Sequence, residues 1–100
     1  MEWINSVSVT DENKLLLSLA SGGKEEYQHI YRAGVGVYWN KDKKGFESTK
    51  IKDDWSCSQW FEHILETTKD SGIELKLSPD VKLVNVPKID KEKILHAYAI

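Results

Sequence analysis

Residues 54–73 read DWSCSQWFEHILETTKDSGI, and the start, the buried face and the end of one helix can be recognised in them. Ser56 is a favoured N-cap, and Gln59, three residues later, completes a capping box with it. Gly72 can adopt the left-handed backbone conformation that ends a helix. The stretch therefore predicts a helix over residues 56–71.

The apolar residues of this helix recur at helical spacing and define one buried face. They stand at i, i+3, i+4, i+7, i+8 and i+11, namely Cys57, Trp60, Phe61, Ile64, Leu65 and Thr68. Trp55 and Trp60 also occupy the two positions of a hydrophobic staple. Each large side chain that this face buries stabilises the fold by roughly 1.5–3 kcal/mol. We therefore expect the helix to lie on the core.

Length and composition indicate a single globular domain over residues 1–100, with 40% hydrophobic and 30% charged residues. The single cysteine excludes an internal disulfide framework. The first residues lack the features of a leader, and no run reaches transmembrane length, so we expect a cytoplasmic protein that does not enter membranes. Of 14 basic residues only Arg32 is arginine. Surfaces that read nucleic acid usually use arginine, so nucleic acid is not the expected partner.

Short alternating segments before the helix predict strands joined by tight turns. Residues 2–9 and 15–20 are expected to form a hairpin around a turn at 10–13, although the second run alone would also suit a helix. A polar loop at 40–45 should close another hairpin, whose return strand is predicted at 46–51.

Two more strands are predicted after the helix, at 73–77 and 81–86, separated by a turn in which Pro79 presets φ. Ile89 and Asp90 then resemble a staple residue and an N-cap.

These two residues would open a short C-terminal helix at 91–98, whose inner face would be Ile94, Leu95 and Tyr98. The predicted fold class is α+β. An antiparallel sheet of about five to six strands, a β-meander, would pack on one main α-helix (56–71), because strands joined by tight turns pair antiparallel.

Residues 26–39, EYQHIYRAGVGVYW, fit two patterns. As a strand they place Tyr27 and Tyr31 on one face. As a helix they give a stripe of Tyr27, Ile30 and Tyr31 that stops at Gly34. We favour one long, bent strand, with the helix as the alternative.

Gly34 and Gly36 would expose the same face of that strand, which implies the close approach of another group. One interpretation is packing against the central helix or Trp60. The other is a small-ligand cleft with a glycine floor and walls formed by Arg32, Tyr38 and a tryptophan.

Glu62, Glu66 and Asp70 form an acidic stripe at i, i+4 and i+8 on the polar side of the helix. Like charges at this spacing mildly destabilise a helix, and a basic partner would relieve them. If Tyr27 and Tyr31 face away from the helix, they add an exposed aromatic patch of the kind that marks interfaces.

Cys57 lies in the first turn of the helix, where the dipole lowers a thiol pKa, but it also belongs to the apolar stripe. His63 and Glu66 could touch a metal, yet no further ligands stand at metal-site spacing. We therefore predict no metal, no cofactor and no catalytic set, and the sequence favours a non-enzymatic protein.

The leading hypothesis is a small soluble non-enzymatic protein that masks or docks onto another protein, with a basic protein as the favoured partner. The alternative is a small-ligand-binding module with its cleft at Gly34 and Gly36, and the third hypothesis is an enzyme that uses Cys57. A homodimer through an exposed strand is compatible with all three. In size and self-containment the chain resembles a stand-alone bacterial accessory protein, such as an immunity protein or the product of a mobile gene cassette.

Overall fold

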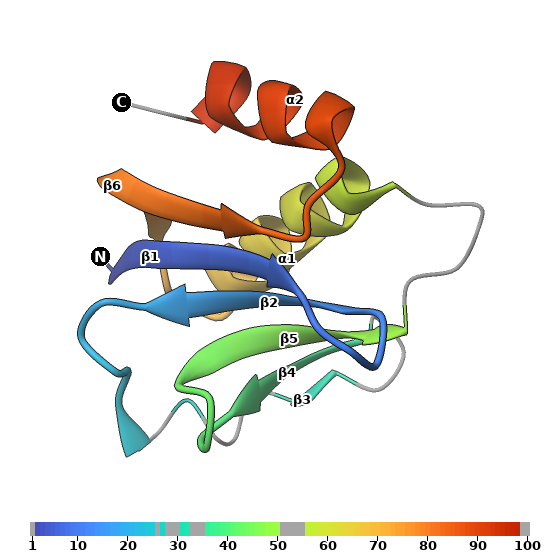
Figure 1. Cartoon of the computed structure of the whole chain (residues 1–100). Coiled ribbons are helices and arrows are strands. Elements are labelled where there is room, and N and C mark those ends of the chain that lie inside the picture. Colours follow the sequence, from blue (N-terminus) through green and yellow to red (C-terminus); the bar gives the residue numbers. More distant parts are fainter. Residues whose placement is uncertain (1, 26, 28–30, 33–35, 51–55, 99–100) are drawn as a thin grey trace.

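The computed structural model describes residues 2–25, 27, 31–32, 36–50 and 56–98. In chain order the elements are β1 (Glu2–Val9), β2 (Lys14–Leu19), β3 (Tyr31–Arg32), β4 (Val37–Asn40), β5 (Gly45–Lys50), α1 (Cys57–Asp70), β6 (Leu75–Val84) and α2 (Lys88–Tyr98). Within this part of the chain the fold is α+β, with one sheet and two helices (Figure 1).

The strands form one sheet in the order β3-β4-β5-β2-β1-β6. β1 and β2 pair antiparallel around a turn at 10–13, where Asn13 takes a left-handed φ of 60°. β4 and β5 pair around a second turn, where the Asn40 side-chain oxygen accepts the amides of Asp42 and Lys43 at 3.1 and 3.0 Å. Both predicted hairpins are confirmed, and the second run is a strand rather than a helix.

The sheet is mostly antiparallel, as predicted, but it is mixed, so the prediction of a β-meander is not confirmed. β5 pairs with β2 as well as with β4, and β6 pairs parallel with β1. The parallel pairing is possible because α1 connects β5 to β6. A chain that crosses over through a helix can form its next strand in the same direction as the strand before it. β5 and β1 both run antiparallel to β2, so a strand that returns parallel to β5 can also pair parallel with β1.

β6 is one strand that continues through Pro79, where the sequence predicts two strands at 73–77 and 81–86. Its register with β1 shifts between Ile4 and Ser6, which marks a bulge or irregularity. Pro79 has no N–H to donate and is tolerated because β6 lies at the edge of the sheet. A homodimer through an exposed strand would have this edge available, although a proline and an irregular register both hinder edge pairing.

The long strand predicted over 26–39 is wrong, because the described residues form a hairpin instead. β3 pairs antiparallel with β4, with Tyr31 opposite Tyr38. Gly36, just before β4, has a φ of +72°, which bends the chain out of strand geometry. Tyr27 belongs to neither strand and lies in a short helical turn.

α1 begins and ends as predicted, within one residue of the predicted bounds of 56–71. The Ser56 hydroxyl accepts the Gln59 amide at 3.3 Å, and the Gln59 side chain accepts the Ser56 amide at 2.8 Å. This confirms the capping box. Gly72 ends the helix with a φ of +87°. Trp55, the other predicted staple residue, lies outside the described residues.

α2 starts at Lys88, three residues before its predicted start, and the predicted staple and cap are wrong. Its first hydrogen bond reaches back to the Pro87 carbonyl at 2.8 Å. Asp90 therefore lies inside the first turn, where its side chain accepts the Ser58 amide of α1 at 3.2 Å. Ile89 is 68% exposed instead of packed.

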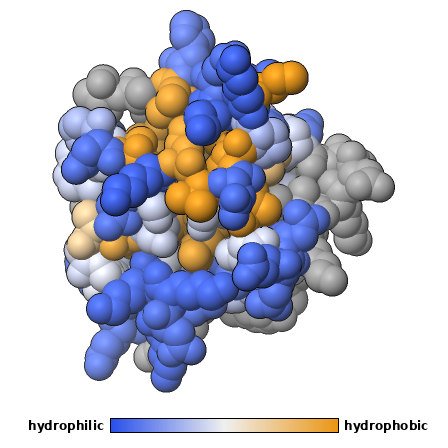
Figure 2. All heavy atoms as spheres, in the orientation of Figure 1, coloured by the Kyte–Doolittle hydropathy of each residue, from blue (hydrophilic) through white to orange (hydrophobic). Residues whose placement is uncertain are grey.

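The inner face of α2 is narrower than predicted. Ile94 is fully buried, but Leu95 is 37% exposed, and the side chain of Tyr98 lies outside the description. Val84 of β6 is exposed as well. Figure 2 shows hydrophobic side chains grouped over the part of the molecule where β6 and α2 lie, surrounded by hydrophilic ones.

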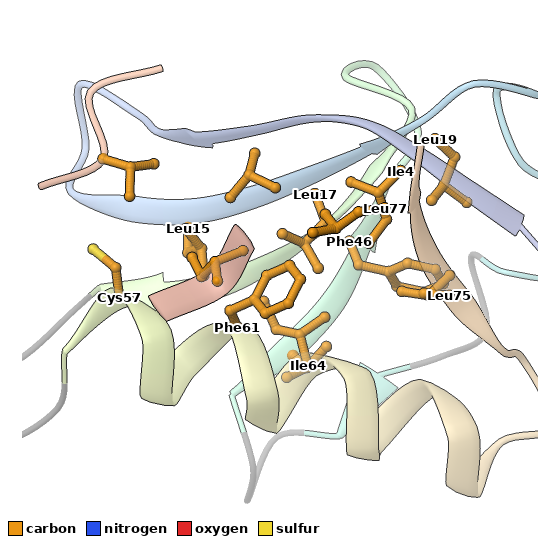
Figure 3. Packing of buried hydrophobic residues seen from close by; sticks show 14 of the residues in the cluster. Ile4, Leu15, Leu17, Leu19, Phe46, Cys57, Phe61, Ile64, Leu75 and Leu77 are labelled. Atoms are coloured by element: carbon orange, nitrogen blue, oxygen red, sulfur yellow. The ribbon is translucent and has the colours of Figure 1, made fainter. Parts of the chain in front are cut away.

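The core lies between the sheet and α1, which covers one face of the sheet (Figure 1). The buried side chains of α1 are Cys57, Phe61, Ile64, Thr67 and Thr68. Figure 3 shows Phe61 and Ile64 directed toward the strands, where Leu17 of β2 meets them. Trp60 and Leu65 of the predicted stripe are half-buried at its margin. The predicted buried face of the helix is confirmed.

Candidate functional site

The outer face of α1 carries the predicted acidic stripe. Glu62, Glu66 and Asp70 are exposed, while Phe61 and Ile64 of the same helix are fully buried. We call these three exposed residues the acidic face. The helix is held by its caps and by the core, so the three residues keep a spacing of about one helical turn along it. Because that spacing leaves like charges unfavourably close, the acidic face is suited to a cationic group.

An open depression adjoins the acidic face, lined by Gln59, Glu62, His63 and Glu66. The His63 ring packs edge-on against the indole of Trp60, with ring centroids 5.6 Å apart and planes at 73°. A side chain that enters the depression meets two carboxylates, an amide and an imidazole. This set of groups suits a positively charged or hydrogen-bond-donating side chain.

Trp60 also packs against Gly36, one of the two glycines of the predicted ligand cleft, and this explains why that position has no side chain. A Cβ at Gly36 would lie 3.2 Å from the Trp60 ring and 2.8 Å from the Thr49 hydroxyl. The space above Gly36 is therefore filled by protein, which agrees with the packing interpretation and not with a ligand cleft at this residue. Gly34 lies outside the described residues.

Tyr27 is a core residue, so it cannot form an exposed aromatic patch. It is 5% exposed, and its ring packs on Trp39 and Phe46 at centroid distances of 5.5 and 5.7 Å. Its hydroxyl donates to the Glu2 carboxylate at 2.6 Å. The prediction that Tyr27 belongs to an exposed aromatic patch is therefore wrong. The backbone of Tyr31 and Arg32 forms β3, and their side chains lie outside the description.

The Glu2 carboxylate explains why Tyr27 turns inward. Burial raises the pKa of Glu2, but hydrogen bonds from Ser21 and Tyr27 and the charge of Lys24 lower it by more, so the net shift is downward. Ser21 donates at 2.6 Å. Glu2 therefore stays ionised in the fold and ties the segment after β2 to the first strand.

A second polar cluster, unforeseen from the sequence, joins three strands through Tyr38. The Tyr38 hydroxyl donates to Glu47 of β5 and accepts from Lys14 of β2 at 3.1 Å. Glu47 is only 2% exposed and also accepts from Lys43 at 3.3 Å. Burial and Glu47 raise the pKa of Tyr38 more than Lys14 lowers it, so the phenol stays a neutral donor. Glu47 in the middle of a strand was the available signal, since a buried carboxylate requires partners.

Cys57 is buried, and its environment opposes thiolate formation. Burial raises the pKa of the thiol, and the nearby Asp90 charge raises it further, against a smaller lowering by a backbone hydrogen bond. A reactive cysteine needs an accessible, electropositive surrounding. In the folded arrangement Cys57 therefore packs as a small hydrophobic residue, as its place in the apolar stripe indicated.

Two further findings concern metal binding and membrane crossing by the described residues. Among them, no three histidine, cysteine, aspartate or glutamate side chains lie close enough together to hold a metal ion. In the same part of the chain, no helix is both long and apolar enough to cross a membrane. The predicted site residues thus separate into an acidic helix face, a packed glycine, a polar cluster around Tyr38 and a core tyrosine.

Comparison with known proteins identifies relatives of one kind. The model of the family described as Integron Cassette Protein Hfx_Cass5 matches residues 4–80. A solved structure titled as an integron cassette protein from the mobile metagenome of the North West Arm sewage outfall is 25% identical. That comparison covers 100% of this chain and 97% of the other, with a TM-score of 0.42. No curated protein matches the chain.

Proposed function

The chain belongs to the Hfx_Cass5 family of integron cassette proteins, and we propose that it is a non-enzymatic accessory protein that docks onto a basic partner protein through the acidic face of α1. Family membership agrees with the resemblance to the product of a mobile gene cassette. Docking is our inference from the arrangement of charges.

The observation that supports docking most directly is the combination of Glu62, Glu66 and Asp70 with the depression beside them. The buried side of α1 rests on the sheet, so binding would require little rearrangement of the helix. A lysine or arginine placed between Glu62 and Glu66 would pair with both carboxylates and remove their mutual repulsion. The acidic face would thus contribute to the association rate and to partner choice.

The two other hypotheses have less support. The space above Gly36 is occupied by Trp60 and Thr49, which argues against the hypothesis of a ligand cleft at that residue. Cys57 is buried and the pKa of its thiol is raised, which argues against the hypothesis of an enzyme that uses this thiol. Docking by a charged helix face requires neither a cleft nor a nucleophile.

The first experiment is capture of partners from the native host with tagged protein, at low and high salt, followed by affinity measurement with a captured protein. The double substitution Glu62→Lys plus Glu66→Lys should weaken binding by about tenfold or more at low salt, because two attractive contacts become repulsive. The effect should shrink in about 1 M salt, where charges are screened within about 3 Å.

The matched control is Glu25→Lys plus Glu92→Lys, which changes the net charge equally at exposed positions outside α1. Binding by this control should stay close to that of the unmodified protein. Equal loss in both double variants would show that only net charge matters, and an affinity indifferent to the α1 substitutions would exclude the acidic face as the docking surface.

A further inference from the structure

Few of the described side chains of the second helix are buried. Among Lys88–His96, whose side chains the structure describes, the buried ones are Asp90 and Ile94. In Figure 1, α2 lies beyond β6, next to the beginning of α1. The linker before it is anchored by Val86, which is buried in the core, so opening of α2 can begin after that residue.

Asp90 forms the polar half of this attachment. Its carboxylate accepts the backbone amide of Ser58, in the first turn of α1, at 3.2 Å. Amides in the first turn of a helix have no partner within the helix, and the positive end of the helix dipole favours a carboxylate there. α2 thus supplies a cap to α1 from 32 residues away in sequence, as an addition to the local cap formed by Ser56.

Ile94 forms the apolar half, and Cys57 lies beside the same contact. Ile94 and Cys57 belong to the same buried cluster, and the Asp90 charge acts on the thiol. Figure 3 shows Cys57 at the α1 start, at one end of the row of core side chains. Phe61 and Ile64 lie further along α1 than Cys57 (Figure 3).

We propose that α2 is a hinged strap that detaches from α1 while the sheet and α1 stay folded, and that this opening controls access to the thiol of Cys57. Among the side chains that the structure describes, Asp90 and Ile94 hold α2, whereas α1 is held by a row of core side chains. Segments with few buried apolar contacts open at a lower free energy than the whole domain unfolds. The device is independent of docking by the acidic face.

The test is the rate at which an aromatic disulfide reagent modifies the native protein, measured at rising urea concentrations below the unfolding transition. Cys57 is the single cysteine, so the signal reports one site. Local opening exposes little surface, so the rate should be nearly independent of urea at low concentrations. Ile94→Ala should raise the rate by about 30-fold or more, and Asp90→Ala should raise it by about tenfold.

Controls separate strap opening from general weakening. Leu95→Ala changes the neighbouring, half-exposed residue and should leave the labelling rate within about threefold of the unmodified protein. Ile94→Val keeps the fold and should raise the rate by about 2- to 12-fold.

Two outcomes would overturn the strap. One is a labelling rate that rises with urea as steeply as global unfolding does, in the unmodified protein and in Ile94→Val alike. The other is labelling of the unmodified protein as fast as that of a free thiol, which would mean that α2 does not shield Cys57.

Discussion

α1 and α2 contact each other, but they are held in different ways. α1 has a local capping box, a glycine that ends it and five buried side chains. α2 starts after a proline, buries Ile94 and Asp90 among its described side chains, and leaves Ile89 largely exposed. The comparison shows that a helix with complete local signals can be recognised in the sequence, whereas one held by tertiary contacts is recognised only in outline.

The contrast has a physical basis. Caps and periodicity act within a few residues and are therefore encoded in adjacent letters. The hydrogen bond from Ser58 to Asp90 joins two helices that are distant in sequence, so no local pattern announces it. If the comparison is correct, substitutions in α1 should affect global stability strongly, and those in α2 should affect it less.

The largest effect is expected for Phe61→Ala, in the centre of the α1 core contact. Phe61 is fully buried, so the substitution should lower the free energy of unfolding by about 3–5 kcal/mol. Urea unfolding followed by far-UV circular dichroism measures this change. A loss below about 1 kcal/mol would contradict the view that α1 organises the core.

Ile94→Ala tests the second helix in the same assay. Its loss should be about 2–3 kcal/mol, at the lower end of the range for truncating a buried aliphatic side chain, and smaller than that of Phe61→Ala. If α2 detaches without unfolding of the sheet and α1, the dependence of the unfolding free energy on urea concentration should be the same in this variant as in the unmodified protein. A loss equal to that of Phe61→Ala would erase the difference between the two helices.

Ser56→Ala compares the local cap with the cap supplied by α2. Removing the hydroxyl that accepts the Gln59 amide should cost about 1 kcal/mol of unfolding free energy. The same change should leave the labelling rate of Cys57 less affected than Asp90→Ala does. The reverse order would mean that α2 docking depends on the α1 cap.

A similarly small effect is expected for Gly72→Ala, at the end of α1. No atom lies within 4 Å of the added Cβ, so only the left-handed φ of +87° opposes the substitution, by about 1 kcal/mol. Gly72→Asn should recover part of that loss, because asparagine tolerates this conformation. Thermal unfolding of both variants measures the difference, and equal stability of all three proteins would argue against a strained glycine position.

Prediction from sequence succeeded where neighbouring residues determine the structure. The turn at Asn13, the loop after Asn40 and the whole of α1 depend on interactions within a few residues, and each is observed. The acidic residues could be assigned to the outer face for the same reason, because helical periodicity alone separates Glu62 and Glu66 from the buried side.

Prediction failed where the structure depends on contacts between segments that are distant in sequence. Tyr27 alternates like a strand residue, but its hydroxyl finds a buried carboxylate in β1 and its ring joins the core. Pro79 reads as a turn, but β6 continues through it as one strand, with a shift in its register against β1. The partners of Glu47 come from β4 and the following loop, so the cluster around it could not be derived from local spacing.

By itself the sequence determined the α+β class, the hairpins and the position, caps and buried face of α1, because propensity, periodicity and capping act over one or two turns of chain. Only the tertiary structure decided the parallel pairing of β6 with β1, the inward turn of Tyr27, the filling of the space above Gly36 and the docking of α2 through Asp90. Each of these joins groups that are distant in sequence, and their free energies depend on which surfaces meet after the chain has folded.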